Sequence, residues 1–245
     1  MKALVLAAGY ATRLYPLTLD RPKALLEVGG KPMLDRVLER LQAMGVDETI
    51  VVTNARFTPH FQEWAKGKKC VTIVNDGTTS NEDRLGAIGD IGFVLDELDL
   101  DDDDLVVVAG DNLFAEDISG FAAYGREVDA PVLAVHDVGD LGSMREYNQV
   151  EVDAEGRVVF MEEKPERART TLAGIALYYY PRRVLPLIGQ YLAEGLNPDQ
   201  PGRLPEWLYP RTDLYTWRLP GEWYDIGSAE TLQEADRIFS HSRNG

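Results

Sequence analysis

The sequence predicts an α/β protein with three layers, in which a mixed, mainly parallel sheet lies between helices and a small C-terminal lobe follows. In the first half, short β-branched runs alternate with stretches whose apolar residues recur at helical spacing. This alternation is typical of strand–helix–strand crossovers in a parallel sheet. In the second half, short strands follow one another and a hairpin turn is expected near Ala154 to Gly156, so the sheet is expected to be mixed.

The elements of the first half follow from these two periodicities. Each expected strand is a short apolar run rich in valine, isoleucine or threonine, and each expected helix has one apolar face. In chain order they are strand Ala3–Ala7, helix Met33–Met44, strand Thr49–Thr53, helix Pro59–Ala65, strand Val71–Val74, helix Ala87–Leu95 and strand Leu105–Ala109. The acidic residues Asp99 and 101–104 come before the last strand, and such a charge run is expected to be a solvated loop.

The second half is expected to add strands and two helices. The strands are Pro131–His136, Gln149–Val152, Val158–Met161, Ala173–Tyr180 and Leu214–Leu219, and the helices are Arg182–Glu194 and Ser228–Phe239. Pro186 should kink or interrupt the first helix because proline lacks a backbone donor, and Ser228 should cap the second. Residues 195–202 should form a loop and 241–245 a frayed end. No linker rich in proline, glycine or serine divides the chain, so residues 1–245 are expected to form a single domain.

Composition limits the classes of function. The chain has 245 residues, 44% of them hydrophobic, with a formal net charge of −16. Such acidity argues against nonspecific nucleic-acid binding, and no apolar run reaches the roughly 20 residues that span a bilayer. The single cysteine, Cys70, excludes an internal disulfide framework and favours the cytoplasm. The sequence does not fix the oligomeric state, and a homo-oligomer is compatible with it.

A loop of small residues with two cations follows the first strand. It reads LAAGYATRLYPLT from Leu6 and is followed by Arg21-Pro22-Lys23. Small residues let backbone amides approach a phosphate closely, and fixed cations complete an anion site. The loop matches neither G-x-x-x-x-G-K-[ST] nor G-x-G-x-x-G, the two common phosphate-binding patterns. The alternative is a surface loop with two solvated cations.

This string resembles the signature of the sugar-1-phosphate nucleotidylyltransferases, LAAG-x-G-T-R-L-x-P-L-T…P-K. Ala11 stands where that family usually has glycine. The resemblance implies a Rossmann-like fold, the nucleotide-diphospho-sugar transferase fold, and the reaction of a sugar 1-phosphate with an NTP to give an NDP-sugar and pyrophosphate. It also implies that Arg13 contacts the leaving pyrophosphate and Lys23 the phosphates. With them, Ala8, Gly9 and Thr12 would bind the nucleotide.

Two aspartates are candidate ligands for Mg²⁺. Asp111 directly follows the expected strand Leu105–Ala109 and Gly110, at the edge where open α/β sheets bind ligands. Asp225 lies in WYDIGSAE, which resembles the family's W-x-D-[IV]-G-[ST]-x-E. Magnesium prefers one or two carboxylates together with phosphates and waters. The alternatives are a turn cap for Asp111 and a helix cap for Asp225.

The acceptor site is expected between two further strands. Glu162-Glu163-Lys164-Pro165 resembles the family's E-K-P, which implies that Lys164 contacts the sugar phosphate and Glu163 the sugar hydroxyls. Ala173-Gly174-Ile175 resembles the family's [NA]-G-[IL], which implies that Gly174 lets the sugar approach the backbone closely. Asn148 stands where the family's Y-G-V has glycine, which would crowd or re-polarise the sugar pocket and puts glucose 1-phosphate itself in question.

The base segment departs from better-known members of the family. Asn75 and Gly86 are the expected equivalents of its base-contacting residues, with extra polar residues between them. An amide both donates and accepts hydrogen bonds, so Asn75 suits the edge of uracil or thymine and favours UTP or dTTP. Two alternatives stay open: a CTP-dependent transferase acting on a phospho-alcohol such as phosphocholine, and a catalytically silent regulatory domain.

Overall fold

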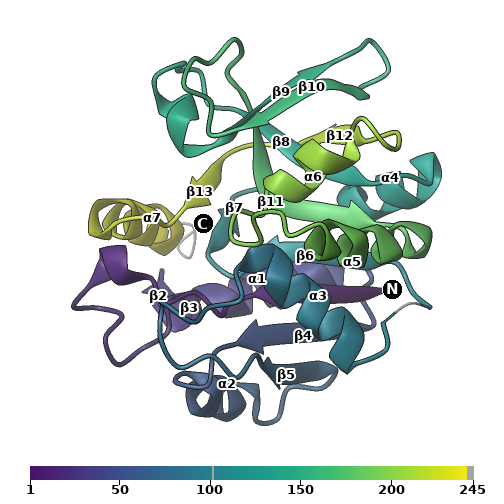
Figure 1. Cartoon of the computed structure of the whole chain (residues 1–245). Helices are drawn as coiled ribbons and strands as arrows, with labels where there is room; N and C mark the ends of the chain where they lie inside the picture. The colour runs from purple at the N-terminus through teal and green to yellow at the C-terminus, as the bar shows by residue number, and fades with distance from the viewer. Residues whose placement is uncertain (101, 242–245) are drawn as a thin grey trace.

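The computed structural model describes residues 1–100 and 102–241, and a nine-stranded mixed sheet forms its centre (Figure 1). The strands are β1 (Lys2–Leu6), β4 (Glu48–Thr53), β5 (Val71–Asn75), β6 (Leu105–Ala109), β8 (Val132–Asp137), β9 (Asn148–Val152), β10 (Val158–Glu163), β11 (Leu172–Tyr180) and β12 (Tyr215–Arg218). Their main path is β10-β9-β11-β6-β1-β4-β5, with β8 joining β11 to β12. The strands β6, β1, β4 and β5 pair in parallel, whereas β11 pairs antiparallel with β6, β8 and β9.

Helices cover both faces of the sheet, which confirms the predicted fold class. They are α1 (Met33–Ala43), α2 (Thr58–Ala65), α3 (Ala87–Glu97), α4 (Gly120–Val128), α5 (Leu185–Ala193) and α6 (Arg203–Leu208). On β1, Leu4 belongs to the core with α3, α5 and α6, while Ala3 and Val5 belong to the core with α1, α2 and α4. This alternation is the two-residue period of a strand that is buried on both faces.

The helix predicted over Arg182–Glu194 differs from the structure at its start. A 3-10 turn, Arg182–Val184, comes first, and α5 begins at Leu185 with Pro186 in its first turn. Proline is tolerated there because the amide that it lacks has no partner inside the helix. Helices α4 and α6 lie where the sequence analysis placed none, and the strand predicted over Leu214–Leu219 is β12.

The C-terminal segment returns to the start of the chain. Strand β13 (Trp223–Asp225) pairs antiparallel with β7 (Asn112–Phe114), with Asp225 opposite Asn112. Helix α7 (Ala229–His241) follows; the Oγ atom of Ser228 accepts a hydrogen bond from the Thr231 amide at 3.2 Å, as predicted for a cap. In Figure 1, α7 lies near the short β2 (Glu27–Val28) and β3 (Lys31–Pro32) hairpin.

Parts of two predicted segments, the acidic loop and the frayed C-terminal end, lie outside the residues that the structure describes. Asp101 and residues 242–245 lie outside the described residues. Within the described part, none of the helices combines the length and the apolar character that crossing a bilayer requires.

Candidate active site

Two adjoining cavities lie at the carboxyl edge of the parallel strands. The larger, about 340 Å³, is lined by seven of the predicted site residues: Arg13, Asp111, Asn148, Glu163, Lys164, Gly174 and Asp225. The smaller, about 170 Å³, is lined by Gly9, Lys23, Asp111 and neighbouring apolar residues. Asp111 lines both cavities, so the junction between them lies directly after β6.

The loop after β1 lies beside the smaller cavity. Ala11 has φ +47°, a left-handed conformation that glycine adopts without cost and alanine does not, which explains the family's glycine at this position. The carbonyl of Ala11 accepts a hydrogen bond from the Thr18 hydroxyl at 2.8 Å. Ala8 is buried, and its carbonyl accepts from the side-chain amide of Asn54 at 2.8 Å. Asn54 was not predicted; it directly follows β4 at the same sheet edge.

Charged side chains converge at the junction of the cavities. Lys23 forms an ion pair with Asp111, and the β7–β13 pairing brings Asp225 to the same place. Burial, and next the negative charge of Asp111, raise the pKa of Asp225 to about 6, while Lys23 and Arg13 act in the opposite direction. Burial and a neighbouring carboxylate disfavour the ionised form of a carboxyl group, and a nearby cation favours it.

The two carboxylates fit Mg²⁺ as part of a larger ligand set. The described residues hold no cluster of three or more histidine, cysteine, aspartate or glutamate side chains that would bind a metal by themselves. Mg²⁺ often takes one or two protein carboxylates and completes its six ligands with phosphate oxygens and waters. Asp111 and Asp225 are therefore suitable ligands when a phosphate chain lies beside them.

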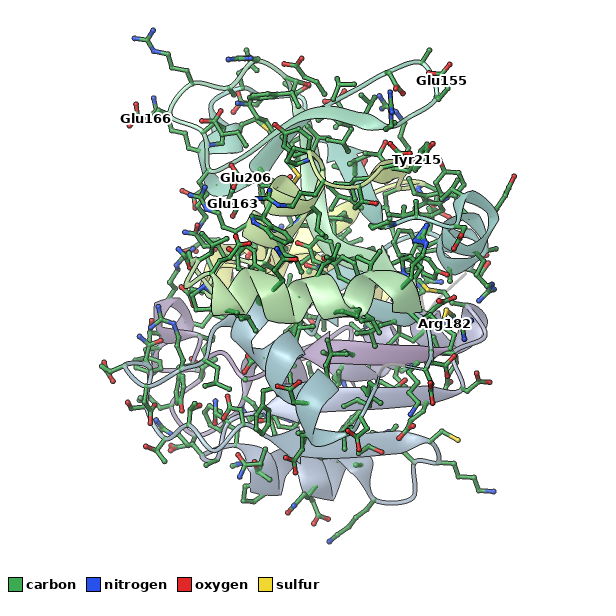
Figure 2. The ribbon with its side chains drawn as sticks, turned by 45° about the vertical axis from the view of Figure 1, so that its right-hand side comes forward. Glu155, Glu163, Glu166, Arg182, Glu206 and Tyr215 are labelled. Carbon is green, nitrogen blue, oxygen red and sulfur yellow. The ribbon has the colours of Figure 1, made fainter. Side chains whose placement is uncertain are left out.

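Asn148 and Glu163 form the buried wall of the larger cavity. The Asn148 carboxamide bonds both backbone groups of Gly174, accepting from its amide at 2.8 Å and donating to its carbonyl at 3.2 Å. A Cβ atom on Gly174 would lie 2.2 Å from Asn148 Oδ1, so glycine is required for this contact. Glu163 is 7% exposed, and burial raises its pKa. Figure 2 shows Glu163 beside Glu206 of α6.

Lys164 directly follows β10 and has a strained backbone conformation. Its φ is +50°, which is uncommon for a residue other than glycine and costs free energy. The Lys164 amide donates to the Tyr147 carbonyl at 2.8 Å, which holds the turn. The turn keeps Lys164 at the rim of the larger cavity.

The chain is similar to known proteins over nearly its whole length. The sequence profile of the nucleotidyl transferase family matches residues 2–241. The chain belongs to the nucleotidyl transferase family. It is 29% identical, over 97% of its length, to a glucose-1-phosphate thymidylyltransferase of Streptomyces antibioticus. It is 26% identical, over 97% of its length, to a UTP–glucose-1-phosphate uridylyltransferase of a Synechocystis strain.

The chain spans 65% of the first of these two relatives and 63% of the second, so the match covers less than two thirds of either protein. The structure is also similar to a crystal structure of UDP-glucose pyrophosphorylase complexed with UDP-glucose. The TM-score is 0.82, the identity is 21%, and 99% of each chain is covered. This likeness shows that the nucleotidyl transferase fold is shared.

Several cavity-lining residues of this family member were not predicted. Tyr147 and Trp223 meet edge to face with their ring centroids 5.4 Å apart, and both line the larger cavity, as does the loop 199–202. Tyr147 directly precedes Asn148, and Trp223 lies two residues before Asp225, so this proximity in the sequence was the available signal. Nothing in the local sequence of the loop indicates that it reaches the cavity.

Four of the predicted nucleotide residues line neither cavity: Ala8, Thr12, Asn75 and Gly86. The Asn75 side chain accepts a hydrogen bond from the Gly77 amide at 3.0 Å. Gly86 has φ +84°, and a Cβ atom there would lie 2.6 Å from the Cα atom of Asp199. The need for glycine at position 86 is therefore explained by the contact with Asp199.

A buried carboxyl pair lies behind this base segment. The Asp90 carboxyl group on α3 is 6% exposed and faces that of Asp76 at hydrogen-bonding distance. With both groups ionised, Asp90 Oδ1 would have no donor among the residues that the structure describes. Burial, and next the charges of Asp76 and Asp199, raise the pKa of Asp90 to about 8.

This pair predicts a pH-dependent stability difference for Asp90→Asn. The folded chain keeps the Asp90 proton up to pH about 8, whereas the unfolded chain releases it near pH ~4. The raised pKa of Asp90 therefore contributes fully to the free energy of unfolding of the wild type below pH ~4. This contribution is lost as the pH rises toward the folded pKa, by at most roughly 1.4 kcal/mol per pH unit. In urea unfolding, the free energy of unfolding of Asp90→Asn should rise relative to that of the wild type between pH 5 and pH 8.5. The same difference between the two proteins at both pH values would contradict the assignment.

Proposed function

We propose that this chain transfers a nucleotidyl group from an NTP to a sugar 1-phosphate, releasing pyrophosphate and forming an NDP-sugar. The observation that carries the proposal is the convergence of Arg13, Lys23, Lys164 and the two aspartates around adjoining cavities. One cavity would hold the triphosphate and the other the acceptor, with Asp111 between them. The names of the relatives support the same chemistry.

In the proposed reaction, a phosphate oxygen of the acceptor attacks the α-phosphorus in line. A new P–O bond forms as the bond from the α-phosphorus to the bridging oxygen breaks, and pyrophosphate leaves with that electron pair. The attacking oxygen is already ionised at neutral pH, so no general base is required. Rate acceleration then comes from positioning and from neutralising charge. Mg²⁺, when bound to Asp111 and Asp225, would neutralise phosphate charge.

The chain's own cations have separate roles in this proposal. Lys23, held by Asp111 at the junction, would bind the triphosphate chain. Arg13 would stabilise the charge that grows on the departing pyrophosphate, and Lys164 would align the acceptor phosphate. Glu163 and the Asn148 wall would contact the rest of the acceptor. Retention of all three cations together with both aspartates argues against a catalytically silent domain.

The proposed nucleotide is UTP or dTTP. Support comes from relatives named for uridylyl and thymidylyl transfer and from the ability of the Asn75 amide both to donate and to accept hydrogen bonds. Asn75 ends β5 at the carboxyl edge of the sheet, outside the linings of the two cavities. Another relative is provisionally named a mannose-1-phosphate guanyltransferase, so the family name alone does not select the base.

The test is pyrophosphate release, measured with each of five nucleotides (UTP, dTTP, CTP, GTP and ATP) against a panel of sugar 1-phosphates and phosphocholine. We expect UTP or dTTP to give the highest kcat/KM, and a sugar 1-phosphate to be required. GTP or ATP clearly first would overturn the base assignment. CTP first, with phosphocholine as the acceptor, would replace the proposed function with that of a phospho-alcohol transferase. No release with any pair would favour the silent domain.

A further inference from the structure

The loop 196–202 between α5 and α6 contacts both halves of the proposed site. On one side, Arg84 of the base segment (residues 75–86) makes a forked ion pair with Asp199. Its Nε donates to Oδ1 at 2.8 Å and its Nη2 to Oδ2 at 3.0 Å. Such two-point pairing of guanidinium and carboxylate fixes orientation as well as distance. The position of Asp199 is therefore tied to that of the base segment.

Backbone contacts strengthen the connection. The amide of Ile88 at the start of α3 donates to the Pro198 carbonyl at 2.7 Å, and that of Ala87 to the Asp199 carbonyl at 3.4 Å. First-turn amides have no partner inside their own helix, and here the loop supplies those partners. Gly86 allows the approach, since a Cβ atom there would lie 2.7 Å from the Pro198 carbonyl oxygen.

The other side of the loop forms part of the acceptor cavity. Residues 199–202 line the cavity together with Lys164 and Glu163. A Cβ atom on Gly202 would lie 1.9 Å from Glu163 Oε2, so the loop backbone lies directly against the buried glutamate. A displacement of the loop would therefore move a wall of the acceptor cavity.

We propose that the Arg84–Asp199 ion pair couples nucleotide binding to acceptor binding, through a loop that contacts both the base segment and the acceptor cavity. This inference rests on the proposed function. A nucleotide that immobilises the base segment also immobilises Asp199, so the acceptor then binds to a wall that is already ordered. Ordering by one ligand that benefits a second is positive cooperativity, and it is reciprocal. Arg84 and Asp199 are positioning residues here.

Initial rates over a grid of NTP and acceptor concentrations measure this coupling. For the wild type, we expect the acceptor KM to fall by about fivefold or more between limiting and saturating NTP, within the usual range of such couplings. In Arg84→Ala this ratio should fall below about twofold, with kcat changed by less than about threefold, because the arginine contacts no reacting atom. Arg84→Lys should restore only part of the ratio, because an ammonium can still pair with Asp199 but cannot form the two-point fork.

The matched control is Arg157→Ala. Arg157 also pairs with aspartates, at 3.1 Å to Asp153 and to Asp213, and its side chain is 49% exposed against 40% for Arg84. It lies near the β9–β10 hairpin tip, which Figure 2 shows at Glu155, well apart from Glu163. Half-exposed pairs add little to stability, so both variants should fold, and the control should keep the wild-type ratio.

Amide hydrogen exchange separates the coupling from the function. Saturating UTP or dTTP should slow exchange at Ile88 and in loop 196–202 of the wild type and of Arg157→Ala, but not in the loop of Arg84→Ala. Nucleotide binding and turnover without loop protection, or an unchanged KM ratio in Arg84→Ala, would overturn the coupling alone. A chain that binds none of the five nucleotides would overturn the proposed function and this inference together.

Discussion

Replacing Asp111 or Asp225 by asparagine is expected to lower kcat by roughly 100-fold or more, the scale of losing one main partner of transition-state charge. Each change removes a carboxylate from the place where the two cavities meet. The shape of the side chain is kept, so the β7–β13 pairing that positions Asp225 should persist. Rates of pyrophosphate release at saturating substrates measure the effect.

For the same reason, EDTA is expected to abolish turnover of the wild type, and added Mg²⁺ is expected to restore it. Asp47→Asn is the matched control, because Asp47 precedes β4 and therefore lies at the amino edge of the sheet, opposite the cavities. It should keep the wild-type rate. Full activity of either site variant, or of the wild type in EDTA, would show that the two aspartates have no role in holding a metal.

Arg13→Ala and Lys164→Ala should separate kinetically. The charge of the departing pyrophosphate grows only in the transition state, so the loss of Arg13 should appear mainly in kcat, by roughly 100-fold. The acceptor phosphate is charged in both states, so the loss of Lys164 should raise the acceptor KM at least as much as it lowers kcat.

Steady-state rates with each substrate varied in turn make this comparison. An unchanged acceptor KM in Lys164→Ala would contradict the role assigned to Lys164. A change in Arg13→Ala that is confined to the KM of the nucleotide would contradict the role assigned to Arg13. Lys23, which forms the ion pair with Asp111, is expected to affect both parameters, because it would bind the triphosphate before and during the reaction.

Periodicity predicted the fold because the burial of the sheet is regular. Strands β1, β4 and β6 are buried on both faces. At five or six residues each, they are too short to be predicted as helices. The predicted start of α5 was wrong. Pro186 is compatible with a helix only in the first turn, and the spacing of the apolar residues does not indicate where that turn lies. Helix α6 is six residues long, too short for a clear apolar period.

The site was predictable where a motif places the residue directly after a strand. Asp111 follows β6 at the carboxyl edge of the parallel strands, and Lys164 follows β10. Asp225 ends β13, which belongs to a separate two-stranded sheet, so it reaches Asp111 through the pairing of β13 with β7. Residue Asp199 has no such signal, since its place depends on how the loop after α5 folds back onto Gly86. This contact explains why position 86 is glycine, and the explanation does not require a bound nucleotide base. No pattern in the local sequence indicates the contact.

Isotope transfer tests the central claim most directly. UTP or dTTP labelled at the α-phosphate is incubated with the chain, Mg²⁺ and a sugar 1-phosphate, and the products are separated by chromatography. We expect the label to move into a sugar nucleotide in the same amount as pyrophosphate is released, and we expect omission of the sugar phosphate to stop both. Label appearing as the nucleoside monophosphate, or pyrophosphate released at the same rate without the sugar phosphate, would contradict it.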